Sequence, residues 1–123
     1  DLSRNLFSGT LPATLFNLDR LRIIYLADNF LEGAIPDNYQ NALSLRDLYL
    51  NGNLLTGTVP EIAATSFRNL TELLVNGNSV TGTMPASICQ LRDNAVLEDL
   101  WADCLGRSPE IECDVPGCCT QCF

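Results

Sequence analysis

Hydrophobic positions recur along this chain with a period of 24 or 25 residues, in the same pattern each time. One copy reads Leu18-x-x-Leu21-x-x-Ile24-x-Leu26-x-x-Asn29-x-Leu31-x-Gly33-x-Ile35-Pro36. Equivalent residues follow at Leu45, Leu48, Leu50, Asn53, Leu55, Gly57, Val59 and Pro60, and at Leu70, Leu73, Val75, Asn78, Val80, Gly82, Met84 and Pro85. A partial copy precedes them at Leu2, Asn5, Phe7, Gly9, Leu11 and Pro12. Such a repeat predicts a solenoid in which each copy forms one coil.

Within each copy, inward and outward positions alternate around Ile24 and its equivalents, which predicts a short strand per coil and a parallel sheet across the coils. Asn29 and its equivalents follow where the chain turns inward. Their carboxamides can both donate and accept, so we expect a buried ladder. A second short strand is predicted around Gly33, and Pro36 and its equivalents should lead into convex α or 3₁₀ turns. The residues expected to face the core from these turns are Leu15, Tyr39, Ile62, Phe67 and Ile88.

The phrase L-x-x-L-x-L-x-x-N, followed by L-x-G-x-[IVLM]-P, resembles the plant-type leucine-rich repeats of receptor-kinase ectodomains and polygalacturonase-inhibitor-like proteins. The resemblance covers roughly residues 1–91. With the periodicity, it implies an α/β solenoid: a leucine-rich-repeat horseshoe with a parallel concave sheet, short second strands, convex turns and a disulfide-rich C-terminal cap. We divide the chain into repeats over 1–88 and a last coil with cap over 89–123. Because Asp1 enters in mid-repeat, we expect a fragment whose first repeat is truncated.

Six cysteines, an even number, crowd the last third of the chain, which is typical of an oxidised, exported protein. They are Cys89, Cys104, Cys113, Cys118, Cys119 and Cys122. A zinc site formed by the last four, or a redox pair at Cys119-x-x-Cys122, would leave Cys89 and Cys104 unexplained. A disulfide-stapled cap explains all six. We expect Cys89 and Cys104 each to hold one tail cysteine, and the neighbours Cys118 and Cys119 to reach different partners.

The cap motif runs from Leu97-x-x-Leu100-x-Ala102-Asp103-Cys104 through Pro109-Glu110-Ile111-x-Cys113 to Cys118-Cys119-Thr120-x-Cys122-Phe123. It resembles the cysteine-rich end of leucine-rich-repeat proteins from diatoms and related algae. It departs from the plant receptors, whose end cap carries fewer cysteines. We therefore do not infer a receptor-kinase role for this chain from the resemblance.

Composition narrows the function further. Seven basic residues, fifteen acids and no histidine give a net charge of −8, which disfavours nucleic acid and anionic membranes as partners. Without histidine the chain lacks the commonest general base and a common metal ligand, so we expect no enzyme, no metal and no cofactor. No apolar run reaches the roughly 18 to 20 residues of a membrane-spanning helix, so we expect no direct membrane insertion by this chain.

Outward strand positions predict a binding site on the concave face. They form a column of Tyr25, Tyr49, Leu74 and Trp101, flanked by the acids Asp47, Glu72 and Asp99 on one side and the amides Asn51 and Asn76 on the other. Binding surfaces favour tyrosine and tryptophan, although aromatic residues also suit strands in general. We therefore expect a protein, peptide or polysaccharide ligand for an extracellular module, secreted or at the cell surface.

Other interpretations remain. A structural cell-wall or matrix protein is the next choice, and the Ser/Thr row beside the glycines, broken at Glu32 and Ala34, leaves ice binding as a more distant one. Glycoside hydrolysis by two carboxylates is disfavoured because the acids are expected on an open, solvated face. Asn69-Leu70-Thr71 is a glycosylation motif, expected at the edge of the sheet.

Overall fold

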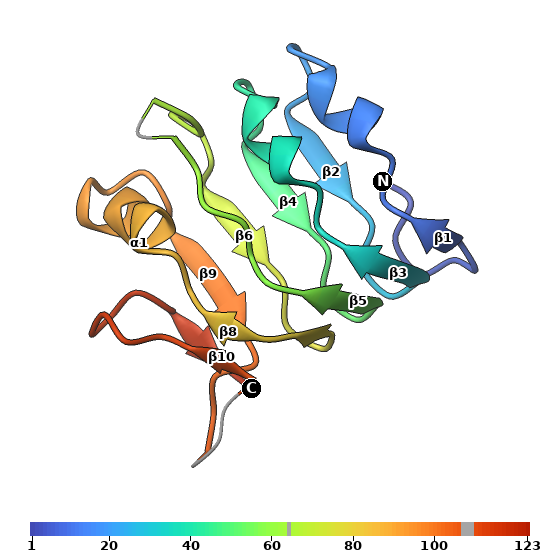
Figure 1. Ribbon diagram of the computed structural model, residues 1–123. Coiled ribbons are helices and arrows are strands. Elements are labelled where there is room, and N and C mark those ends of the chain that lie inside the picture. The colour runs from blue at the N-terminus through green and yellow to red at the C-terminus, as the bar shows by residue number, and fades with distance from the viewer. Residues whose placement is uncertain (64, 107–109) are drawn as a thin grey trace.

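The computed structural model describes residues 1–63, 65–106 and 110–123, and each repeat forms one coil of a solenoid (Figure 1). The first strands of the coils make a five-stranded parallel sheet. In spatial order they are β2 (Ile23–Tyr25), β4 (Asp47–Tyr49), β6 (Glu72–Leu74), β9 (Asp99–Ala102) and β11 (Gln121–Cys122). Ile24 pairs with Leu48, which pairs with Leu73. The leucine-rich-repeat fold and its strand register are confirmed.

The second strands form a parallel sheet of their own. It contains β1 (Ser8–Thr10), β3 (Phe30–Ala34), β5 (Leu54–Gly57) and β7 (Ser79–Val80). Beside it, β8 (Gly82–Thr83) pairs with β10 (Ile111–Glu112) from the tail. The convex side carries two 3₁₀ turns and one helix, η1 (Ala13–Asn17), η2 (Asp37–Asn41) and α1 (Ala86–Asp93).

After Pro60 the described residues 61–63 and 65–69 form no helix like η1 or η2, but isolated turns, such as the one in which the Ser66 N–H donates to the Ala63 carbonyl at 2.9 Å. The Ala63 N–H donates to Oε1 of Gln40 in the preceding coil at 2.7 Å. Phe67 then adopts a left-handed backbone with φ of 51° and still reaches the core. A cross-coil hydrogen bond therefore replaces the local helical one.

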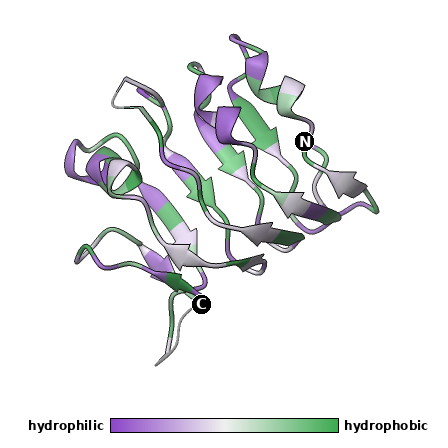
Figure 2. Ribbon diagram, viewed as in Figure 1, coloured by the Kyte–Doolittle hydropathy of each residue, from purple (hydrophilic) through white to green (hydrophobic). Residues whose placement is uncertain are grey.

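The core is a column of side chains that continues from coil to coil, and Figure 2 shows apolar residues recurring on the first strand of each coil. From the convex side, Tyr39 lies between Phe16 and Phe67, with ring centroids at 6.5 and 5.0 Å. Its hydroxyl donates to the Pro60 carbonyl at 2.8 Å. Leu15 packs against the core as predicted and is partly buried, while its neighbour Phe16 is fully buried.

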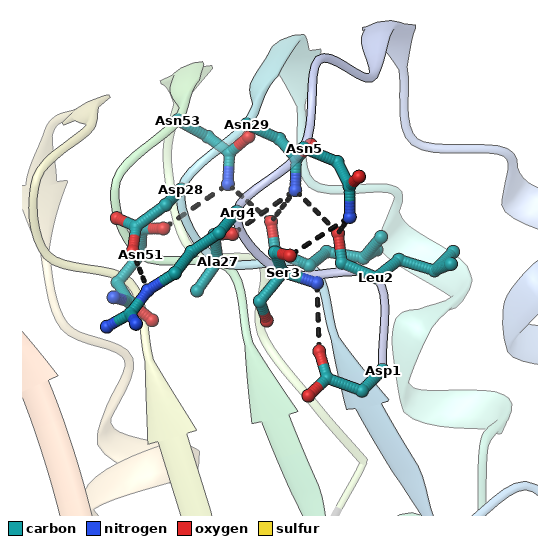
Figure 3. A network of polar contacts seen from close by, with 11 residues as sticks. Asp1, Leu2, Ser3, Arg4, Asn5, Ala27, Asp28, Asn29, Asn51 and Asn53 are labelled. Atoms are coloured by element: carbon teal, nitrogen blue, oxygen red, sulfur yellow. Dashed lines mark hydrogen bonds and ion pairs between the residues drawn. The ribbon is translucent and has the colours of Figure 1, made fainter.

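The asparagine ladder forms as predicted (Figure 3). In the third coil, Nδ2 of Asn53 donates to the carbonyls of Leu26, Leu50 and Asn51 at 3.0 to 3.3 Å, and its Oδ1 accepts the Leu31 N–H at 3.1 Å. Equivalent side chains occur at Asn5, Asn29 and Asn78. Each fully formed rung holds its own turn and also groups in the preceding coil, so the ladder couples neighbouring coils.

Asp103 ends the ladder. Its carboxylate oxygens accept the N–H groups of Gly77 at 3.0 Å and Asn78 at 3.3 Å. In the preceding coil, the equivalent N–H groups of Gly52 and Asn53 bond to backbone carbonyls of the next coil. A side chain therefore supplies the acceptors that a further regular coil would have supplied.

Three disulfides close the cap: Cys89–Cys118, Cys104–Cys122 and Cys113–Cys119. Both pairing expectations are confirmed, and all six sulfurs are bonded in pairs. Helix α1 runs across the 88/89 division of repeats and cap. Pro109 of the cap motif lies outside the described residues. No helix of the described ranges is long and apolar enough to cross a membrane.

Replacing Asn53 by Ala should lower the free energy of unfolding by about 1 to 3 kcal/mol, because the buried Leu31 N–H loses its acceptor. The control is Asn51→Ala, since the Asn51 carboxamide oxygen accepts no hydrogen bond. Denaturant titrations of the two variants test this. Equal losses would show that the ladder does not hold the coils together.

Removing the disulfide between Cys89 and Cys118 should destabilise the domain more than removing that between Cys113 and Cys119. The sequence separations are 29 and 6 residues, for which loop entropy gives about 3.6 and about 2.2 kcal/mol. Cys89 and Cys118 are also buried. The paired Cys→Ala variants, compared by denaturant midpoint, test this order, and the reverse order would contradict it.

Candidate ligand-binding site on the concave sheet

The predicted column forms with one member per coil, but Leu74 is buried between its neighbours, with 6% of its surface exposed, and not on the solvated face as expected. Tyr25 is in register with Tyr49, Tyr49 with Leu74, and Leu74 with Trp101. The two tyrosine rings stack with centroids 4.3 Å apart and an interplanar angle of 27°. The Trp101 ring lies 5.6 Å from that of Phe123, at the end of the chain. The parallel register therefore turns four scattered residues into one continuous strip.

Each tyrosine hydroxyl is held by an acid of the next coil. Tyr25 Oη donates to Asp47 Oδ2 at 3.2 Å, and Tyr49 Oη donates to Glu72 Oε2. Desolvation, the hydrogen bond to Glu72 and its negative charge all raise the pKa of Tyr49. Both phenols therefore stay protonated at neutral pH, and both rings are fixed before any ligand arrives.

Asp47 is not on a solvated face, contrary to the sequence interpretation, because only 2% of it is exposed. Its two oxygens accept from Arg46 at 3.0 and 2.9 Å, from the Thr71 hydroxyl at 3.1 Å and from Tyr25. Burial acts to raise the pKa of Asp47, but these hydrogen bonds and the Arg46 charge outweigh it, so the pKa lies below its usual value. Asp47 thus positions Tyr25.

A hollow of about 510 Å³ lies over the column. Its lining includes seven of the predicted site residues: Tyr25, Tyr49, Leu74, Trp101, Glu72, Asp99 and Asn51. Asp47 and Asn76 are not part of this lining. Ala27, two residues after Tyr25, also lines the hollow, as do Asp1, Ser3, Arg4 and Asp28, which sequence reasoning missed. Asp28 lies in the turn after β2 and the other three lie in the partial first copy of the repeat, and neither segment offers a strand pattern from which to place them.

The charged side chains that line the hollow are mostly acidic. Glu72, Asp99 and Asp28 bring carboxylates, and the single cationic side chain in its lining, Arg4, lies 3.6 Å from Asp28 (Figure 3). The carboxamide oxygens of Asn51 and Asn76 are buried without a hydrogen-bond partner. The rings and carboxylates of the lining, and not these buried oxygens, are therefore what the face offers to a ligand. Such an arrangement suits a ligand that brings donors or positive charge.

Asn69 lies away from the hollow. It is exposed, and its Nδ2 donates to the Leu43 carbonyl at 3.2 Å. The hydroxyl of Thr71, the third residue of the glycosylation motif, is bonded to the Arg46 carbonyl and to Asp47. The position at the sheet edge agrees with the motif, and glycosylation itself stays a prediction.

Asp47→Asn should destabilise the fold by about 1 to 3 kcal/mol at neutral pH through weaker charge-assisted bonds. Because the folded pKa is depressed, this stabilisation is present above the unfolded value of about 3.9 and is lost as the pH falls through the folded one. The stability difference between wild type and variant should therefore shrink below about pH 4. A pH-independent difference in denaturant titrations would contradict the assignment.

Comparison with known proteins agrees with this fold. The leucine-rich-repeat family model matches residues 44–65 and 69–91, and no curated protein matches the chain. The PEPR1–AtPEP1 complex has 39% identity and a TM-score of 0.73 over 81% of this chain and 14% of that one. The Arabidopsis receptor kinase HAESA, in complex with the peptide hormone IDA and the co-receptor SERK1, has 29% identity and a TM-score of 0.72. That match covers 82% of this chain and 17% of HAESA.

A plant ice-binding protein is similar at 26% identity and a TM-score of 0.64, over 80% of this chain and 30% of that protein. The chain thus spans only a small part of each of these structures. What they share with it are the repeat and the solenoid. Repeat pattern, register and these similarities together make the chain a leucine-rich-repeat solenoid of the plant type.

Proposed function

We propose that this chain is a non-catalytic binding module that recognises a protein or peptide through the concave sheet. The observation that carries the proposal is the column of Tyr25, Tyr49, Leu74 and Trp101 along the hollow. Tyrosine and tryptophan bring a large, stiff contact area with a polar end, which is why binding surfaces favour them. The complex of HAESA with a peptide hormone supports this ligand class.

The order of the column supports a binding role over strand propensity alone. Strand propensity accounts for aromatic residues in strands. It does not account for both tyrosine hydroxyls being held by acids of the next coil, nor for a phenylalanine beside the tryptophan. Rings that are fixed in the free protein lose little conformational freedom on binding, and this favours affinity.

The proposed setting is extracellular, either secreted or at a cell surface. Three disulfides in a chain of 123 residues suit an oxidising compartment. The cysteine-rich end supports a further proposal, that the cap is of the kind found in leucine-rich-repeat proteins of diatoms and related algae. Both proposals agree with a ligand met outside the cell.

Other ligands are less well supported. A polysaccharide could stack on the aromatic rings, but it would not use the carboxylates as charges. For ice binding, the exposed hydroxyl row of Thr56, Thr58, Thr81 and Thr83 is interrupted in the neighbouring coil by Glu32 and Ala34. A matrix role would need contacts between copies. The acidic, aromatic hollow favours peptide recognition.

Selection from a phage-displayed library of random peptides on the immobilised full chain tests the proposal. Enriched peptides should bind the wild type and lose about tenfold or more in affinity with Trp101→Ala, a change of about 1.4 kcal/mol or more. Tyr49→Ala should behave in the same way.

The control variant is Thr56→Lys, an exposed position on the other sheet, which should leave affinity unchanged. Circular dichroism and disulfide mass establish that each variant is folded. Peptides that bind both concave variants as tightly as the wild type would refute concave-face recognition, as would a failure to enrich any peptide.

A further inference from the structure

The column has one gap. Leu74 stands between Tyr49 and Trp101, one coil from each, and its side chain is much shorter than an aromatic ring. Two strand spacings separate the flanking residues, about 9.5 Å. A flat group in contact with a ring on both sides needs about 7 to 8 Å. Strand spacing therefore leaves room for one planar group between the two rings, a space called the notch here, with Leu74 beneath it, only 6% exposed.

Both walls of the notch are braced from behind. Tyr49 stacks on Tyr25 at 4.3 Å, and its hydroxyl is bonded to Glu72. Trp101 lies against Phe123 at 5.6 Å. Phe123 is close because Cys104–Cys122 and the pairing of β11 with β9 hold the tail against the last coil. The walls are thus supported from opposite directions, which keeps the notch open.

The rim of the notch carries negative charge and hydrogen-bond acceptors. Glu72 and Asp99 are adjacent in register and both line the hollow. On the other side of the column, Asn51 also lines the hollow. Arg4, the one cationic side chain in the lining, lies 3.6 Å from Asp28. The rim of the notch is therefore acidic, and its carboxylates can accept hydrogen bonds from a ligand.

We propose that this notch binds the side chain of an arginine in an extended peptide, between the rings of Tyr49 and Trp101 and against Glu72 and Asp99. The proposal rests on the function proposed above and names the ligand group that the site selects. A guanidinium is planar, stacks on aromatic faces and carries five donors in one plane. A lysine ammonium brings the charge without the flat surface, and a sugar brings the surface without the charge.

The single tryptophan of the chain makes the notch directly observable, because all tryptophan fluorescence comes from Trp101. The probe is the peptide acetyl-Ser-Gly-Arg-Gly-Ser-amide, titrated against the full chain. Its matched control carries citrulline, which keeps the planar shape and loses the charge. The arginine peptide should change the fluorescence saturably, and the citrulline peptide should bind about tenfold more weakly.

Leu74→Tyr is the matched protein variant. Tyrosine occupies the equivalent position in the two preceding coils, so the fold should accept it while the notch is filled. It should abolish the response to the arginine peptide, and Asp99→Asn should weaken it, whereas Thr56→Lys on the other sheet should not. Equal binding of the citrulline peptide, or undiminished binding by Leu74→Tyr, would overturn the proposal.

The two proposals fail separately. If library peptides bind the wild type but bind Trp101→Ala more weakly, and the arginine probe gives no response, the notch assignment is wrong and concave recognition stands. If the library peptides also bind Trp101→Ala as tightly as the wild type, concave recognition is wrong as well.

Discussion

Each coil of this solenoid must obtain half of its apolar surroundings and part of its hydrogen bonding from the coils beside it. A single repeat is too thin to enclose its own leucines. The asparagine ladder meets this need at the turn, since Asn53 bonds to its own coil and also to Leu26 and Leu31 in the coil before. At the C-terminal end Asp103 and the disulfide-bonded tail replace the missing neighbour. These contacts therefore fix the register of the strands from one coil to the next.

The same constraint creates the proposed site. When the inward leucines are locked in register, the outward residues between them are locked too, and Tyr25, Tyr49, Leu74 and Trp101 must lie in one strip. The fold does not require those residues to be aromatic, nor their hydroxyls to bond to acids of the next coil. The cap contributes as well, because Phe123 braces Trp101 only while the tail is tied down.

The sequence predicted the coils, both sheets, the ladder and the column, because each depends on a periodic pattern. It also predicted that Cys89 and Cys104 would each pair with a tail cysteine, but not which one. It failed where a non-periodic contact decides the structure. Gln40 accepts the Ala63 N–H, whose equivalents at Leu15 and Tyr39 bond to a proline carbonyl, and Arg46 with Thr71 makes buried Asp47 a positioning residue. The role of Asp103 in ending the ladder could have been predicted, since the next position of the ladder is occupied by Leu105 and not by an asparagine.

The most direct test of the central claim is chemical-shift mapping on the full chain, with a peptide selected against it. Concave recognition predicts the largest shifts at the Trp101 indole N–H, at the Leu74 methyl groups and along β4, β6 and β9. The β1–β3–β5–β7 sheet should be unaffected. Shifts confined to that second sheet, or to the two ends of the solenoid, would contradict the account.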